Sequence, residues 1–147
     1  MTGQEHIDAE MGRQLDHITQ ENGCLHAVLF TGDGLLKAKS SQLDRADAER
    51  AAAGLTGIGS LSRGLVDFCG TDELTWRRTI VDFGDHTVMV LTAAANTYLA
   101  VSLTTGLTSD QVVVVTHTAI GVIKAMNEHL SAAERVRPGP NSAYERV

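Results

Sequence analysis

Six histidines are the side chains best suited to bind a metal ion or to transfer a proton. They are spread along the whole chain, at His6, His17, His26, His86, His117 and His129. No two are four residues apart, the spacing at which a helix presents two zinc ligands on one face, and no cysteine or acidic cluster completes a ligand set. We therefore expect no bound metal and no cofactor, and interpret the histidines as solvated or hydrogen-bonded.

Three closely spaced glycines, Gly54, Gly57 and Gly59, could form a phosphate-binding loop. Such a loop follows a strand and leads into a helix N-terminus, whereas these glycines fall inside a predicted helix with no Gly-Lys-Ser/Thr after them. The chain is therefore not expected to be a GTPase itself. The same stretch comes nearest to the Gly-x-Ser-x-Gly elbow of a hydrolase but lacks its frame, so we expect no catalytic residue.

Two adjacent arginines, Arg77 and Arg78, offer a different chemistry. An arginine inserted into a GTPase can stabilise the charge of phosphoryl transfer. The alternative, which we favour, is that one arginine faces solvent and the other pairs across a dimer, with Asp82 as a partner. Trp76 lies beside them, and tryptophan and arginine are both over-represented among binding hot spots.

Composition narrows the class of protein. The 147 residues suffice for one domain with a real core, and no apolar run approaches the length of about 20 residues that spans a bilayer. Eighteen acidic against twelve basic residues give a net charge of −6, which argues against nucleic-acid binding. The N-terminus lacks the features of a signal peptide, so we expect a cytoplasmic protein without membrane insertion. Cys24 and Cys69 are interpreted as small buried hydrophobes.

The elements that position these residues follow from the spacing of apolar side chains. The predicted order is a helix at 4–20, strands at 24–30 and 35–40, a helix at 44–64, strands at 74–83, 86–93 and 98–104, a helix from 109 to about 130, and a disordered tail at 131–147. Asp33-Gly34 and Gly84-Asp85 predict hairpin turns, because tight turns need positive φ. The run Val112–Val115 favours a strand locally, but helical spacing continues through and beyond it.

The helix at 44–64 contains an unusual cost. Each glycine inside a helix is unfavourable by roughly 0.5–1 kcal/mol relative to alanine, and this helix carries Gly54, Gly57 and Gly59. A second backbone lying very close would offset that cost, since glycine and alanine let a helix or sheet approach. The alternative is a short, broken helix.

The chain resembles the Roadblock family, known from dynein light chains and from bacterial regulators of small Ras-like GTPases. The resemblance covers roughly residues 7–130 and rests on the element order, on Ala27-Val28-Leu29-Phe30-Thr31-Gly32-Asp33-Gly34-Leu35, on the Ala/Gly/Leu-rich second helix and on Glu128-His129-Leu130. It is most similar to the actinobacterial members encoded beside a sensor kinase-like protein and a small GTPase.

The resemblance implies an α+β, profilin-like fold. A five-stranded antiparallel sheet lies between helices in the order α-β-β-α-β-β-β-α, with the first and last helices on one face and the glycine-rich helix on the other. This Roadblock-like domain spans 4–130. The resemblance also implies a homodimer in which the second helices pack together and the third strands pair edge to edge, which would remove the liability of an open sheet edge.

The interface residues expected from this arrangement come from the second helix and the third strand. They are Ala51, Gly54, Leu55, Gly57, Ile58, Leu61, Trp76, Arg78, Ile80 and Asp82. The implied function is a non-enzymatic homodimeric adaptor that binds and regulates a small Ras-like GTPase in a signalling complex, with a sensor kinase-like protein as a further partner. The alternative is a small-molecule-sensing signalling module, which requires an apolar pocket with a few convergent polar groups. A hydrolytic enzyme ranks third.

Overall fold

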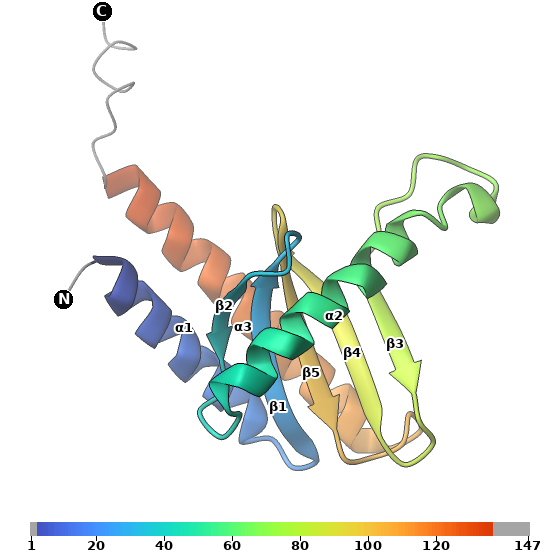
Figure 1. Ribbon diagram of the computed structural model, residues 1–147, viewed down its shortest axis with the longest axis horizontal. Helices are drawn as coiled ribbons and strands as arrows, with labels where there is room; N and C mark the ends of the chain where they lie inside the picture. The colour runs from blue at the N-terminus through green and yellow to red at the C-terminus, as the bar shows by residue number, and fades with distance from the viewer. Residues whose placement is uncertain (1–2, 137–147) are drawn as a thin grey trace, which may run out of the picture.

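Five antiparallel strands form one sheet with helices on both of its faces (Figure 1). The computed structural model describes the backbone of residues 3–136 and the side chains of residues 9–128. Its elements are α1 (Gly3–Thr19), β1 (Cys24–Thr31), β2 (Leu36–Lys39), α2 (Arg45–Arg63), a 3-10 turn (Asp67–Cys69), β3 (Arg78–Asp82), β4 (Thr87–Ala94), β5 (Thr97–Leu103) and α3 (Asp110–Val136). In the figure α2 crosses one face of the sheet, and α1 and α3 lie on the other. The expected fold class and element order are confirmed.

The sheet order β2-β1-β5-β4-β3 places β3 at an edge. The first hairpin forms as its Asp33-Gly34 turn predicts, because Gly34 adopts a φ of +86° and its N–H donates to the Thr31 carbonyl at 2.9 Å. β3, β4 and β5 form a meander in which Arg78 lies opposite Leu91 and Asp82 opposite Thr87. The open edge at the third strand that the family resemblance implied is therefore present in the protomer.

β3 is shorter than the predicted strand at 74–83. At the N-terminal end of β3, the last backbone hydrogen bond to β4 runs from the Thr92 N–H to the Arg77 carbonyl, at 3.1 Å. Before Arg77 the chain leaves the sheet, because the Trp76 ring packs between α2 and Tyr98, with its centroid 5.5 Å from that of Tyr98. The burial of one large aromatic side chain ends the strand.

α2 is a single helix from Arg45 to Arg63, so the broken-helix alternative is wrong. Asp44 caps it as expected: its backbone is extended, and its carboxylate accepts a hydrogen bond from the Ala46 N–H at 3.2 Å. The chain then passes through the 3-10 turn, which ends at Gly70 with a φ of +83°. Figure 1 shows this segment projecting beyond β3, away from the rest of the sheet.

α3 keeps helical geometry through its valine run. Val112, Val115, Ala119 and Val122 are buried against the sheet at spacings of three and four residues, and this packing outweighs the local preference of valine for a strand. The helix extends to Val136, past the predicted end near residue 130, so the first residues of the predicted tail at 131–136 are helical. Residues 137–147 lie outside the described part of the chain.

Two apolar clusters hold the layers together. One lies between the sheet and α1 with α3, and includes Leu15, Ile18 and Val115. The other lies under α2 and includes Phe30 and Val90. Within residues 3–136, no helix has the length and apolar character needed to cross a membrane.

Candidate interaction surface

The α2 residues expected at an interface divide into two groups by exposure. Gly54 and Gly57 are exposed, and a Cβ built on either would meet nothing within 4 Å. Leu61, one turn further on, is 74% exposed. Leu55 and Ile58 instead pack partly against the apolar cluster under the helix. The outer face of α2 is therefore nearly bare of side chains along the glycines and ends in an exposed leucine.

Position 59 of α2 is occupied by glycine for a different reason from positions 54 and 57. It is buried, and a Cβ on it would lie 3.5 Å from the Trp76 ring of its own chain. The Trp76 Nε1 donates to Thr79 Oγ1 at 2.7 Å, which fixes the ring between α2 and the start of β3. Trp76 is thus partly buried and packs against the apolar cluster under α2, next to the outer face of the helix.

The β3 edge offers backbone groups from Arg78, Ile80 and Asp82. The Arg77 carbonyl accepts a hydrogen bond from the Thr92 N–H of β4, and the Phe83 N–H donates to the carbonyl of His86, the residue just before β4. The direction of the backbone hydrogen-bonding groups alternates along an antiparallel strand. The N–H and C=O groups of Arg78, Ile80 and Asp82 therefore point away from β4. These groups form the open edge of the sheet.

The side chains of Arg78, Ile80 and Asp82 lie on the face of the sheet that carries α1 and α3. They stand opposite Leu91, Met89 and Thr87 of β4, of which Leu91 and Met89 belong to the core on that face. Ile80 is 40% exposed. Asp82 Oδ1 accepts a hydrogen bond from the Gly84 N–H at 2.8 Å, which orients the carboxylate. Arg78 is exposed and makes no ion pair with any side chain of residues 9–128.

An exposed apolar segment, which the sequence reading left out, joins α2 to β3. We call residues 64–74 the arm. Phe68 is 90% exposed and Leu65 57%, and Leu74 is also exposed. Cys69 of the arm is a free, exposed thiol, where the sequence predicted a buried one. The apolar group Leu65, Val66 and Phe68 just after a helix, without a helical period of its own, is the one sequence signal that could have identified the arm.

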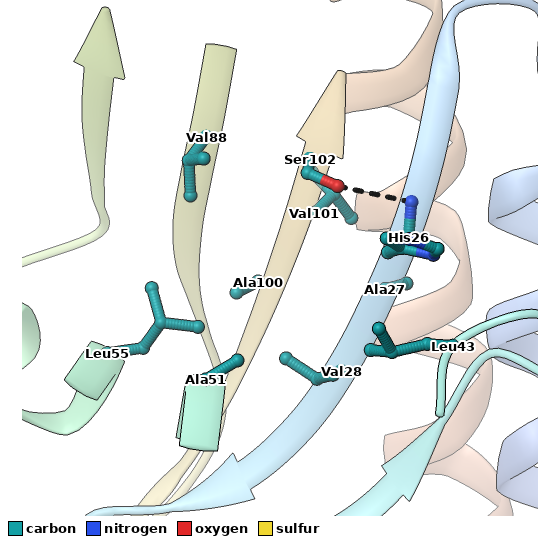
Figure 2. Close-up of a pocket in the computed structure, with 10 residues that line it drawn as sticks. All are labelled: His26, Ala27, Val28, Leu43, Ala51, Leu55, Val88, Ala100, Val101 and Ser102. Atoms are coloured by element: carbon teal, nitrogen blue, oxygen red, sulfur yellow. Dashed lines mark hydrogen bonds between the residues drawn. The ribbon is translucent and has the colours of Figure 1, made fainter. Parts of the chain in front are cut away.

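An apolar pocket of ≈ 230 Å³ opens on the α2 face of the sheet (Figure 2). It is lined by His26, Ala27, Val28, Leu43, Ala51, Leu55, Val88, Ala100, Val101 and Ser102. The His26 N–H donates to Ser102 Oγ at 3.2 Å, and His26 Nδ1 is buried with no hydrogen-bond partner among the described residues. Only Ala51 and Leu55 of this lining were expected at an interface. The pocket is formed by residues distant in sequence, so no local pattern predicts it.

A second cleft, of ≈ 320 Å³, lies against α3. Its walls are the segment Thr75–Arg78, Leu91 and Thr92 of β4, and Ile120 and Ile123 of α3. The two arginines that sequence reasoning singled out thus border a partly apolar cleft beside the β3 edge.

The described side chains show no activated nucleophile. Burial, with a smaller contribution from the nearby Glu21 charge, raises the pKa of the Cys24 thiol from 9.0 to about 11. Asp85 accepts a hydrogen bond from His86, which lowers the pKa of that fully exposed carboxyl. Among the side chains of residues 9–128, no three His, Cys, Asp or Glu groups gather into a metal site; His6 and His129 lie outside that range. The described residues offer instead an open backbone edge at β3, a bare outer face on α2 and an exposed apolar arm.

Both a protein-family model and solved structures match this chain. Residues 11–103 match the family model described as Roadblock/LC7 domain. A Roadblock/LC7 domain from Streptomyces avermitilis is 27% identical, with a TM-score of 0.72, covering 82% of this chain and 97% of that one. MglB from Myxococcus xanthus is 14% identical, with a TM-score of 0.69, covering 84% of this chain and 96% of that one. The gliding protein MglB from Thermus thermophilus is also 14% identical, with a TM-score of 0.66, covering 86% of this chain and 90% of that one. No curated protein matches the sequence.

Proposed function

The chain belongs to the Roadblock/LC7 domain family, and from that premise we propose that it is a homodimeric adaptor that binds a small Ras-like GTPase and adjusts its nucleotide cycle. Roadblock proteins act as regulatory adaptors rather than as enzymes. We extend the same role to this chain, in the cytoplasm and with a sensor kinase-like protein as a further member of the complex. The absence of an activated nucleophile among the described side chains is consistent with an adaptor.

The single observation that supports the dimer is that the open edge of β3 and the bare outer face of α2 are neighbouring surfaces, and neither has a partner within the described protomer. The open edge strand β3 lies beside the C-terminal half of α2, where the Ser62 and Thr79 hydroxyls are hydrogen-bonded, and the outer face of that helix has open space at Gly54 and Gly57. A sheet edge seeks another strand, and a helix face without side chains permits close approach of another helix. One partner that supplies both is a second copy of this chain.

The pattern of β3 also specifies a register for that pairing. Pairing a strand with its own copy in antiparallel fashion places a two-fold axis perpendicular to the sheet. With the axis at Ile80, Ile80 meets its own copy, and Arg78 faces Asp82 of the other protomer on both sides of the axis. An axis at Arg78 or at Asp82 would place like charges opposite each other, which is destabilising. Opposite charges and an apolar centre therefore favour the axis at Ile80.

The dimer is tested by light scattering and by filling the bare helix face. The wild-type chain should have about twice the mass of 15.7 kDa, and Gly57→Leu should raise the dimer dissociation constant by at least about tenfold, because a leucine separates the helices. Gly121→Leu is the matched control, since Gly121 is also an exposed helix glycine with nothing within 4 Å of a Cβ. A wild-type chain that stays monomeric at high concentration would contradict the dimer.

The GTPase partner is tested with a small Ras-like GTPase from the same genome. We expect co-elution with the chain and a change in the rate of nucleotide hydrolysis or exchange. Gly57→Leu should reduce both effects, whereas Gly121→Leu should keep them. Failure to form a complex in either the GDP-bound or the GTP-bound state would overturn the proposal for this partner.

Small-molecule sensing is the second candidate, and the apolar pocket is the observation in its favour. Its ≈ 230 Å³ is smaller than the about 300–1,000 Å³ of most ligand sites, and the polar groups on its wall come from His26 and Ser102. A pocket of this size suits one or two side chains better than a whole ligand.

A further inference from the structure

The apolar pocket lies at the end of the sheet where β3 ends. Val88 pairs with Val81 near the end of β3, and Ser102 pairs with both Val88 and His26. The lining residues of α2, Ala51 and Leu55, come from its middle. The C-terminal half of α2 runs on toward β3 (Figure 1), so it does not cover this corner of its own sheet.

The arm lies at the opposite end. It connects the last residue of α2 to the start of β3 and projects past that edge strand on the α2 face (Figure 1). Its apolar side chains, Leu65 and Phe68, are among the most exposed of the described residues. An aromatic side chain that is 90% exposed has lost the hydrophobic stabilisation that burial of about 150–250 Å² would provide.

A two-fold axis at Ile80, perpendicular to the sheet, places the arm end of one protomer beside the pocket end of the other. Both α2 helices then lie on the same face of the joined sheet. The axis therefore carries the arm of one protomer over the α2 face of the other, toward the end where β3 ends and the pocket opens. We propose that, in the homodimer, each arm inserts Phe68, supported by Leu65, into the pocket formed by His26, Val28, Val88, Ala100 and Ser102 of its partner. This inference rests on the proposed homodimer and adds the occupant of the pocket.

The chemistry of the two surfaces agrees. Carbon side chains form most of the pocket, and the arm presents the aromatic Phe68 and the aliphatic Leu65 as exposed apolar side chains. The one charged residue between these two, Asp67, is itself exposed. Aromatic side chains, phenylalanine among them, are enriched at the cores of protein interfaces, and binding hot spots cluster in well-packed, desolvated pockets. A two-fold dimer would therefore contain two identical contacts, in each of which the arm of one protomer fills the pocket of the other.

Cysteine crosslinking tests the placement directly, because Cys69 adjoins Phe68 and is exposed. In a Cys24→Ala background, Val88→Cys places a second thiol on the pocket wall. A short bis-maleimide should then give a covalent dimer. Thr92→Cys is the matched control: it lies on the same face of β4 at the other end of the strand, and it should give none. The Cys24→Ala parent should also give none, because the axis separates the two copies of Cys69.

A second variant measures the contribution of the arm to assembly. Phe68→Ser should raise the dimer dissociation constant by about tenfold or more, since it removes an aromatic anchor. It should leave the unfolding of the diluted, monomeric chain unchanged, because Phe68 is exposed there.

The outcomes separate this inference from the proposed dimer. Crosslinking through Val88→Cys together with weaker assembly of Phe68→Ser supports arm docking. A wild-type dimer that neither crosslinks through Val88→Cys nor responds to Phe68→Ser overturns arm docking and leaves the homodimer intact. A monomeric wild-type chain overturns both.

Discussion

At the residue scale, the three glycines of α2 illustrate how one sequence feature can have two causes. The sequence suggests a single close contact for all of them. In the structure Gly59 faces Trp76 of its own chain, whereas Gly54 and Gly57 face open space. Sequence spacing alone did not separate them, because the position of Trp76 depends on how the start of β3 packs against the helix.

Gly59 should accept a methyl group. A Cβ there lies 3.5 Å from the Trp76 ring, an ordinary van der Waals contact, so Gly59→Ala should raise the free energy of unfolding by about 0.5–1 kcal/mol through helix propensity. Gly59→Leu should lower it, because the larger side chain meets the ring. Urea unfolding followed by circular dichroism measures both; equal stability of the two variants would contradict the tight packing of Trp76.

The two cysteines should differ in reactivity. Burial raises the pKa of Cys24 to about 11, so this thiol stays protonated at pH 8, whereas Cys69 is exposed. A thiol reagent at pH 8 should modify one group per folded chain quickly and two in denaturant, and Cys69→Ser should remove the fast reaction.

The same shift gives a pH dependence of stability. Because the folded chain holds the proton of Cys24 more tightly than the unfolded chain does, its contribution is complete below pH 9.0 and is lost as the pH rises toward about 11. Cys24→Ala should flatten this part of the curve of unfolding free energy against pH. An unchanged slope between pH 9 and 11 would be inconsistent with a half-buried thiol that the fold keeps neutral.

At the element scale, helices and hairpins were predictable where local chemistry determines them. Asp44 caps α2 and Gly34 closes the first hairpin, as their residue types indicate. The length of β3 was not predictable, because Trp76 ends it through a contact with α2. The arm and the pocket escaped prediction for the same reason: each depends on segments brought together by the fold. The valine run of α3 is the opposite case, where spacing correctly outweighed propensity.

The register of β3 predicts the effect of reversing charges. Arg78→Asp should weaken the dimer, because each Asp82 would then face a second carboxylate, and the double variant Arg78→Asp with Asp82→Arg should restore it. Cross-strand pairs contribute about 0.2–1 kcal/mol each, so two symmetric pairs should change the dissociation constant by roughly two- to thirtyfold at low salt. Dilution series by light scattering measure this. Arg77→Asp is the control, and an effect equal to that of Arg78→Asp would contradict the register.

At the scale of the whole molecule, fold and assembly are coupled. If two chains share the β3 edge and the arms, dissociation exposes Phe68 and the pocket together, so stability depends on concentration. The melting temperature should fall by about 5 °C on hundredfold dilution, and Gly57→Leu should show a smaller change than Gly121→Leu. Thermal melts over a concentration series provide the measurement; a melting temperature independent of concentration would argue against a dimer.

The sheet has a second edge, β2, whose chemistry sets a limit to assembly. This strand is only Leu36–Lys39 and carries lysines at positions 37 and 39. Short, positively charged edges discourage the addition of further strands. Pairing through β3 is a self-complementary contact that closes on itself, so the two outer ends of a joined sheet would both be β2. Growth would therefore stop at two chains, and the protein would be protected from forming fibres.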